Sequence, residues 1–557
     1  MSKQIKRIFG IDLGTTYSSI ACVDEYGKTI VVPNAENQRV TPSVVFFDGD
    51  NIVVGDVAKE SAKLYPNDVV SFVKRSMGEP NFLFEHNSNT YRAEEISSFI
   101  IRKIVQDAEK NLGISGTKDI VITCPAYFGI NEREATRRAG EIAGFNVRQI
   151  INEPTAAAIA FGSMESTEER VVLVYDLGGG TFDITMIDIK PNASIEVICT
   201  GGDHNLGGKD WDDRIVAHLV QEFQTAVGLD EDILEDPDTC QDLQLSAEKA
   251  KKVLSQRDHT PVLITHGGER VKVTLERKTF EKITRDLLER TISLTHEMLE
   301  EAGKKGYDHF DEIILVGGST RMPHVTTRIK KEFDIDPQLF DPDEAVAKGA
   351  AIYGWKLFLQ DEVKGHVARK TGKSIEQLED LSDLELDDVL GEVEHLVADD
   401  TGYSLADVKS SKIKIINVTS KSFGVVAHNA EDKEVVYNLI LKNTDVPITA
   451  NRSFGTAVNN QEAASIQIME NESSDIITLP EHAISIGTAV LKLPSDLKAD
   501  TPIEITFRLN EEGRLEITAE ETSETRRSVN ATIETRSVIR GEELAKAKAR
   551  SEHIVIT

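Results

Sequence analysis

Short apolar runs alternate with longer amphipathic stretches through the first 360 residues of the chain. Residues 8–11, 171–175 and 313–316 are three such runs, each of the length and character of a buried strand. Strand-like runs separated by helical stretches are typical of an α/β fold. The pattern predicts an α/β domain whose site lies where several strand ends converge.

The pattern changes twice further along the chain. Residues 361–410 are acidic and carry Leu and Val at roughly helical spacing, which predicts an inserted helical segment. From about residue 418 to 535 the alternation has a period of two, as along residues 503–509 and again along 515–519, with a turn between them. This period of two predicts an antiparallel β module.

Composition narrows the class of protein. The 557 residues exceed one core, so about three domains are expected. Lys and Arg number 63 against 94 Asp and Glu, a formal charge of -31, whereas a nucleic-acid binder normally has the opposite sign. The acidity itself is read as a source of solubility. Four sparse cysteines, no signal-type apolar segment and no membrane-length run predict a cytoplasmic protein without a membrane partner.

One phosphate-binding phrase occurs twice. GIDLGTTYSS covers residues 10–19 and VYDLGGGTFD covers residues 174–183. Each places an Asp at a strand end, then a glycine turn whose N–H groups can face an oxyanion, then a Thr. An Asp beside phosphate requires a bridging cation, most simply Mg²⁺ held through water; the ordinary alternative is a turn or helix cap. The repeat predicts two related lobes around one nucleotide.

Further phrases follow in a fixed order: FVKRSMG, CPAYF, INEPTAAAIAFG, GGDHNLGGKDWD, VGGSTRMP and DPDEAVAKGAA. Together they resemble the 70-kilodalton heat-shock chaperones of the DnaK type over nearly the whole chain. The resemblance implies an α/β actin-like two-lobed ATPase domain, a linker, and an all-β sandwich that binds extended apolar peptide segments. The domain limits expected are 1–360 for the ATPase, 361–410 for the acidic helical insert, 411–417 for the linker, 418–540 for the sandwich and 541–557 for a short helical tail in place of a lid.

The resemblance also assigns the nucleotide site, with ATP or ADP and Mg²⁺ as cofactors and K⁺ as a further candidate. The expected catalytic residues are Asp12, Lys74, Glu153, Asp176 and Thr181. The expected metal residues, acting through water, are Asp12, Asp176 and Asp183. The expected nucleotide contacts are Gly14, Thr15, Thr16, Tyr17, Gly178, Gly179, Gly180, Gly207, Gly208, Glu248, Lys251, Lys252, Ser255, Gly318, Ser319, Arg321 and Asp343.

Two of these positions need comment. Lys74 matches the family lysine that approaches the γ-phosphate and the attacking water, where an ammonium offsets the developing charge. Outside this phrase, a lone lysine is usually a solvated surface charge. Lys252 stands where some family members have Arg, and an ammonium stacks less well on adenine, so Arg321 is the favoured stacking partner.

The resemblance places a peptide channel in the β module. Its expected residues are Val425, His428, Phe454, Ala457, Ala464 and Ile466. Backbone hydrogen bonds to an extended peptide would give affinity, and each apolar candidate is as readily an ordinary core residue. Pro125 and Arg133 match residues that relay the nucleotide state, although a proline after a strand is usually only a turn.

Several positions depart from the family pattern. Ala464 is smaller than usual and His428 lies near an arch position, which suggests a wider, more polar channel. The linker lacks its acidic ends, and Gln149 replaces an arginine that contacts J-domain partners. The resemblance implies a J-domain co-chaperone and a nucleotide exchange factor as partners, and these two departures predict that co-chaperone stimulation and domain coupling differ from the family pattern. A missing lid is expected to speed peptide release.

The sequence is compatible with three functions. The leading one is an ATP-driven, peptide-binding chaperone whose two sites are coupled. A small-molecule kinase of the same ATPase superfamily would need an acceptor cleft with a catalytic base, and would transfer phosphate to a metabolite instead of water. An actin-like filament former would sediment in an ATP-dependent way. The insert could lengthen the tether, dock a partner or act as a solvated spacer.

Overall fold

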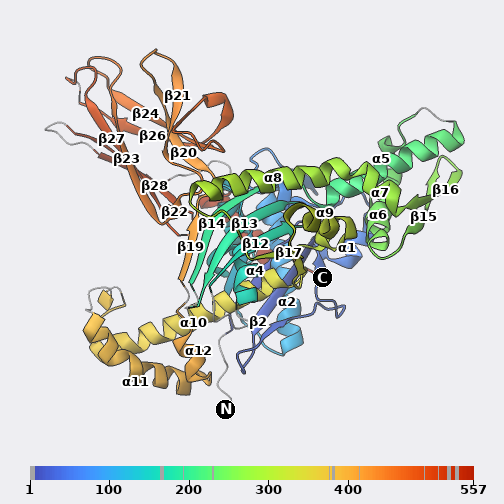
Figure 1. Ribbon diagram of the computed structural model, residues 1–557, viewed down its shortest axis with the longest axis horizontal. Helices are drawn as coiled ribbons and strands as arrows, with labels where there is room; N and C mark the ends of the chain where they lie inside the picture. The colour runs from blue at the N-terminus through green and yellow to red at the C-terminus, as the bar shows by residue number, and fades with distance from the viewer. Residues whose placement is uncertain are drawn as a thin grey trace.

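The computed structural model describes residues 7–162, 169–191, 194–228, 231–375, 377–378, 383–412, 414–494, 496–511, 513–522, 528–532 and 538–557. Residues 376 and 379–382 of the predicted insert and residue 413 of the predicted linker lie outside this set. An α/β body forms most of the molecule, and a β-sandwich lies at one end of it (Figure 1). None of the described helices is long and apolar enough to cross a bilayer.

Lobe I is built on a six-stranded sheet of order β11-β10-β1-β2-β3, with β4 paired to β2. Its strands are β1 Phe9–Asp12, β2 Tyr17–Val23, β3 Thr29–Val31, β4 Thr41–Pro42, β10 Asp119–Cys124 and β11 Asn146–Asn152. Helices α2 Ala93–Leu112 and α3 Ile130–Ile142 pack together against this sheet. A small outer part comprises β5 Val45–Asp48, β6 Asn51–Val54, α1 Asp56–Ser61, β7 Val69–Val70, β8 Phe84–His86 and β9 Asn89–Tyr91.

Lobe II repeats this plan around a seven-stranded sheet of order β18-β17-β12-β13-β14-β19-β22. Its strands are β12 Arg170–Leu177, β13 Phe182–Lys190, β14 Ser194–Asp203, β17 Glu312–Val316, β18 Gln338–Leu339, β19 Lys414–Val418 and β22 Asp445–Val446. In each lobe an antiparallel hairpin has a parallel strand on its other side: β10 beside β1, and β17 beside β12. The repeated sequence phrase therefore corresponds to the same arrangement of three strands in each lobe.

Helices complete lobe II and join it to lobe I. Those of lobe II are α5 Gly208–Val227, α6 Pro237–Leu254, α7 Arg277–Ile283, α8 Arg285–Lys304 and α9 Pro323–Phe333, with the hairpin β15 His259–His266 and β16 Glu269–Glu276 at its outer end. Two helices, α4 Glu153–Gly162 and α10 Ala345–Thr371, pack against each other. Helix α10 contacts β1 and β2 of lobe I, and α4 contacts β12 and β13 of lobe II, so the two helices together connect the lobes.

The predicted β module is a sandwich of two antiparallel sheets, of orders β25-β21-β20-β24-β26 and β23-β27-β28-β29. Its strands are β20 Ser422–His428, β21 Glu434–Ile440, β23 Ile448–Gly455, β24 Ala463–Asn471, β25 Ile477–Thr478, β26 Ala483–Lys492, β27 Pro502–Leu509, β28 Leu515–Glu521 and β29 Ser528–Thr532. The predicted alternation is confirmed, since Ile505 pairs with Ala519 and Phe507 with Ile517, and all four side chains lie in the core.

The acidic segment is helical, as the spacing predicts. Helix α10 continues without a break to Thr371, and α11 Asp383–Thr401 and α12 Leu405–Lys409 follow it. Leu390, Val393 and Val397 of α11 are buried in the same apolar cluster as residues of α10. In the part of α11 whose side chains are described, residues 389–401, the acids Glu392, Asp399 and Asp400 are exposed.

The linker is a strand of lobe II. In β19, Lys414, Ile415 and Ile416 pair in parallel with residues 194–196 of β14, and Asn417 and Val418 pair with β22 from the sandwich side. Just before this strand, the Lys356 ammonium and the Gln360 amide donate hydrogen bonds to the carbonyls of Ser410 and Ser411. These two hydrogen bonds fix the residues before β19 to helix α10.

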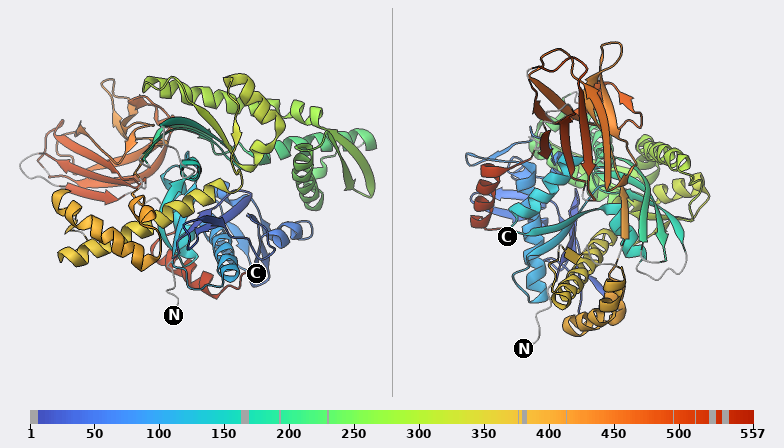
Figure 2. Two further views of the ribbon diagram at one scale, coloured as in Figure 1. Left: turned by 60° about the horizontal axis from the view of Figure 1, so that its bottom comes forward. Right: turned by 90° about the vertical axis from the view of Figure 1, so that its left-hand side faces the viewer.

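The last described segment returns to lobe I. Helix α13 Gly541–His553 packs on α2 and α3, and in Figure 2 it lies beside the blue helices, away from the sandwich. After the helix, Val555 and Thr557 exchange backbone hydrogen bonds with Ile52 of β6. The segment 541–557 thus adds a short strand to lobe I and does not lie over the sandwich loops.

Candidate functional site

The two glycine hairpins meet at the floor of a cleft between the lobes. A Cβ added to Gly179 would lie 1.9 Å from the Thr16 hydroxyl, and one added to Gly180 would lie 2.4 Å from the Thr15 side chain. Only glycine permits this approach of one hairpin to the other. The cleft has a volume of about 680 Å³, enough for a nucleotide.

Most of the predicted nucleotide residues line this cleft. Those that line it are Asp12, Gly14, Thr15, Thr16, Tyr17, Lys74, Glu153, Asp176, Gly178, Gly179, Thr181, Glu248, Lys251, Lys252, Ser255, Gly318, Ser319, Arg321 and Asp343. Three predicted glycines lie behind the wall: Gly180, Gly207 and Gly208. Asp183 is also behind it, buried, with its carboxylate accepting a hydrogen bond from the Tyr127 N–H at 3.0 Å.

A buried lysine sits among the carboxylates of the cleft floor. The Lys74 ammonium donates to a Glu153 oxygen at 2.6 Å, and both side chains are less than a tenth exposed. Burial opposes the charge on Lys74, but the carboxylates of Glu153 and Asp12 outweigh it and raise the pKa. The ammonium therefore stays charged at neutral pH, as offsetting transition-state charge requires.

The carboxylates of the floor lack enough positive charge among the described residues. Burial, followed by the charge of Glu153, raises the pKa of Asp12 to about 7 and that of Asp183 to about 7. The same two causes raise the pKa of Asp176 well above its ordinary value. A cation among them would relieve the repulsion. Within the described parts of the chain no three such side chains converge to ligate a metal directly.

The end of the cleft that is predicted to hold adenosine contains a network around Tyr17 that the sequence did not reveal. The Tyr17 hydroxyl donates to Glu248 at 2.9 Å and accepts from Lys59 and Lys252 at 2.9 and 2.7 Å. Lys59 comes from α1 of lobe I and Glu248 from α6 of lobe II, and their ion pair of 2.5 Å spans the cleft. Lys59 stands in an unremarkable helical phrase, so only the fold brings it here.

The departure at Lys252 has a clear structural outcome. Its ammonium pairs with Glu248 at 2.7 Å and lies 4.5 Å from the centre of the Tyr17 ring. The Lys252 ammonium is therefore engaged with the Glu248 carboxylate and the Tyr17 ring. Arg321 is about half exposed and is paired with Asp343, so its planar group remains at the mouth of the cleft.

The predicted channel residues fall into two groups. Val425, Ala464 and Ile466 are buried in the core of the sandwich. Phe454 is half-buried and packs against that core from β23, while Ala457 and His428 are exposed. The structure thus brings the candidates to one end of the module but gives only some of them an accessible surface.

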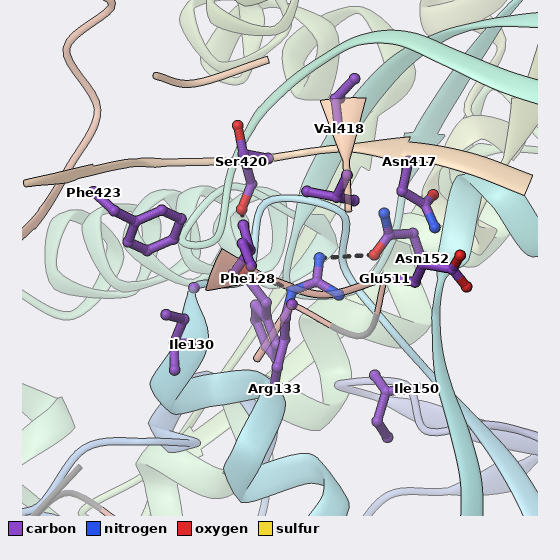
Figure 3. Close-up of a pocket in the computed structure, with 15 residues that line it drawn as sticks. Phe128, Ile130, Arg133, Ile150, Asn152, Asn417, Val418, Ser420, Phe423 and Glu511 are labelled. Atoms are coloured by element: carbon purple, nitrogen blue, oxygen red, sulfur yellow. Dashed lines mark hydrogen bonds between the residues drawn. The ribbon is translucent and has the colours of Figure 1, made fainter. Parts of the chain in front are cut away.

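Arg133 lies at the junction between lobe I and the sandwich (Figure 3). Its guanidinium donates to the Asn152 side chain at 2.7 Å and to the carbonyls of Phe128 and Ala126. Residues of the linker and the sandwich, among them Asn417 and Phe423, line the same small pocket. Pro125 closes the turn behind it through its carbonyl, which accepts from the Phe128 N–H.

A carboxylate of the sandwich completes this junction. Helix α3 begins after Gly129, which has no capping side chain, and the Glu470 carboxylate of β24 accepts a hydrogen bond from the Ile130 N–H at 3.2 Å. Burial, followed by the charge of Glu132, raises the pKa of Glu470 to about 7. Sequence reasoning missed this contact because Glu470 looks like any polar residue of a strand.

Comparison with known proteins agrees with this geometry. The family model described as Hsp70 protein matches residues 8–88, 79–367 and 402–555. The chaperone protein DnaK of Halobacterium salinarum, in strains R1 and NRC-1, is 36% identical over 524 residues, which is 93% of this chain and 73% of the relative. The chain therefore belongs to the Hsp70 family.

Membership in this family fixes the general activity. The protein is an ATP-dependent molecular chaperone and an ATPase, with ATP or ADP and Mg²⁺ as its ligands in the general manner of the family. Its clients are unfolded polypeptides, and co-chaperones act with proteins of this type.

Proposed function

We propose that ATP binds between the two glycine hairpins and that its hydrolysis controls peptide binding by the sandwich. The N–H groups of Thr15 and Thr16 face the phosphates from lobe I, and those of Gly178 and Gly179 face them from lobe II. The glycine contacts between the hairpins support this arrangement, because Gly179 and Gly180 lie too close to the Thr16 and Thr15 side chains to carry a side chain of their own.

Within this site each charged side chain has a distinct role. Lys74, held by Glu153, offsets negative charge that grows on the γ-phosphate and positions the attacking water. Asp12, Asp176 and Asp183 would hold Mg²⁺ through water, and K⁺ is a candidate for the same acidic floor. When bound, Mg²⁺ supplies charge neutralisation of the phosphates. The Thr181 hydroxyl faces the same region and hydrogen-bonds the γ-phosphate or the water.

The nucleoside end is held by α6 and the turn after β17. Glu248, Lys251, Lys252 and Ser255 present one helical face to it, and Gly318, Ser319, Arg321 and Asp343 present the other side. We assign adenine stacking to Arg321, because Lys252 is engaged with Glu248 and Tyr17. The ion pair between Lys59 and Glu248 closes the cleft over the nucleotide.

The peptide site is the end of the sandwich that carries Phe454, Ala457 and His428. An extended apolar segment would make backbone hydrogen bonds there, and the wall behind it is Val425, Ala464 and Ile466. Coupling to the ATPase runs through the docked strand β19 and through Arg133 and Pro125 at the junction. J-domain and exchange-factor partners are proposed only as classes, because Gln149 and the linker differ from the family pattern.

The observation that carries this proposal is the buried pair of Lys74 and Glu153 at the meeting point of the hairpins. It is tested by single-turnover ATP hydrolysis with and without a short apolar peptide, for the wild type and Lys74→Ala. Hydrolysis that requires Lys74 and accelerates with peptide is the expected result. Phosphate transfer to a small-molecule acceptor, with no effect of peptide, would overturn it in favour of a kinase.

A further inference from the structure

The open side of the sandwich carries an arginine stacked on two aromatic rings. The Arg452 guanidinium lies 4.4 Å from the centre of the Tyr437 ring and 5.9 Å from that of Phe454. The two rings are themselves 5.9 Å apart in an edge-to-face arrangement. Such stacking holds a guanidinium flat while leaving the N–H donors at its rim free to bind.

This stack adjoins the proposed peptide site. Phe454 is a predicted channel residue two positions along β23 from Arg452, so both side chains lie on the same face. Tyr437 pairs directly with Val425, another channel candidate, across β20 and β21. On the far side of Tyr437, its other partner Ile477 is about half exposed. The apolar side chains of Phe454 and Ile477 and the cation of Arg452 therefore lie near one another on the sandwich.

No acid of the described residues competes for Arg452. Among the described residues it forms no ion pair, although the sandwich carries many carboxylates, and its side chain is exposed. The neighbouring Asn451 amide bonds Glu504 on the opposite face of β23, which keeps that carboxylate away from the stack. A fixed, planar, unpaired guanidinium is suited to receive a carboxylate through two parallel hydrogen bonds.

We propose that Arg452 is a specificity-determining residue that selects client segments with an Asp or Glu side chain close to the apolar residue seated in the channel. The inference rests on the proposed peptide site and names a substrate class for it. Because residues two apart in an extended chain are separated by about 7 Å, as Arg452 and Phe454 are along β23, the acid belongs about two positions from the apolar anchor.

The test is fluorescence anisotropy of labelled short peptides with a leucine core, bound to the full chain with ADP. The parent peptide carries Gln at the flanks, and its variants carry Glu or Lys two positions before or after the core. Wild type should bind one Glu variant about threefold to fivefold more tightly than the parent, and raised salt should shrink this preference. The Lys variant should bind more weakly than the parent.

Two variants and a matched control isolate Arg452. Arg452→Gln should abolish the preference for Glu while the parent peptide still binds, and Arg452→Lys should retain only part of it because the planar fork is lost. Arg508→Gln removes the same charge from an exposed position of β27 that pairs with Thr449, and should leave the preference intact. Unchanged unfolding curves would confirm that each variant is folded.

Two other outcomes overturn the inference in distinguishable ways. Equal binding of Glu and Gln peptides by the wild type, or an equal loss of preference in Arg508→Gln, rejects a role for Arg452 but leaves the apolar channel standing. If no leucine-core peptide binds the wild type at all, the proposed peptide site fails, and the assignment of Arg452 fails with it.

Discussion

The nucleotide cleft and the β-sandwich differ in what their site residues do for the fold. In the cleft, Lys74 and Glu153 form a buried ion pair, and the role proposed for it is catalytic. In the sandwich, Ile466 and Val425 belong both to the proposed channel and to the core. A substitution in the cleft therefore reports on catalysis, whereas one in the channel wall mixes peptide binding with stability.

The largest effect is expected from Lys74→Ala, which tests the cleft side of this comparison. Loss of the ammonium should lower single-turnover ATP hydrolysis about 100-fold or more, because charge on the γ-phosphate is no longer offset. Lys330→Ala, which removes an exposed lysine of α9, should leave the rate unchanged. A fall of less than about threefold in Lys74→Ala would exclude this role.

Substitutions at Ile466 and Ala457 sharpen the sandwich side. Ile466→Ala should destabilise the sandwich by about 2–4 kcal/mol, because it removes buried apolar volume. Ala457 is exposed, so Ala457→Asp should change stability by less than about 0.5 kcal/mol and still weaken binding of an apolar peptide. Urea unfolding followed by hydrogen exchange of β24 would measure the first effect, and anisotropy the second. If Ala457→Asp unfolds the module, the division between wall and core is wrong.

The junction between the two regions should respond to pH through Glu470. When the sandwich is docked on lobe I, the pKa of Glu470 is about 7, above the ordinary value of 4.5. The docked state therefore binds the proton of Glu470 more tightly than the undocked state does. Docking should therefore be strongest below pH 4.5, weaken as the pH rises to about 7, and then remain constant. The ratio of docked to undocked molecules should change by at most tenfold per pH unit.

Hydrogen exchange of the first turn of α3, measured across this range, would detect the change. Glu470 faces the Ile130 N–H, the carboxylate of Glu132 and the cations of Lys421 and Arg133. Glu470→Gln keeps an oxygen that can accept from Ile130 and removes the titration, so its profile should be flat from pH 5 to 8. A profile for this variant as steep as that of the wild type would assign the pH dependence to another group.

The smallest effect is expected at the returning segment. The Arg550 guanidinium pairs with Glu95 at 2.8 Å and lies 4.7 Å from the centre of the Tyr91 ring. Arg550→Ala should loosen α13 by about 1 kcal/mol, seen as faster hydrogen exchange over residues 541–557. Lys546→Ala on the same helix removes a mostly exposed pair and should have no measurable effect.

The parts of the fold that repeat a local pattern could be predicted from the sequence. A local signal, either a turn or a period, marks the two phosphate hairpins, the alternating β module and the helical insert. Such a signal can be recognised without knowing any long-range contact. The site residues predicted in the hairpins follow from the same local signal, and most of them line one cleft in the structure.

The remaining features depend on which distant surfaces meet. Lys59 joins Glu248 across 189 positions, and Glu470 reaches Ile130 across 340 positions, and neither has a local pattern that marks it. Tyr437 and Arg452 read as ordinary strand residues until the two sheets bring them together. The path of residues 541–557 back to β6 was likewise hidden, because a short apolar tail can pair with any free strand edge.

This last contact has a mechanical consequence. The sandwich is attached to lobe II through β19, and the chain that leaves it is attached to lobe I through α13 and the strand beside β6. Because α4 and α10 join the two lobes, lobe I, lobe II and the sandwich are each attached to the other two. A change in the angle between the lobes must therefore either deform the sandwich or break one of its two attachments to the lobes. The attachment with the weaker contacts would break first.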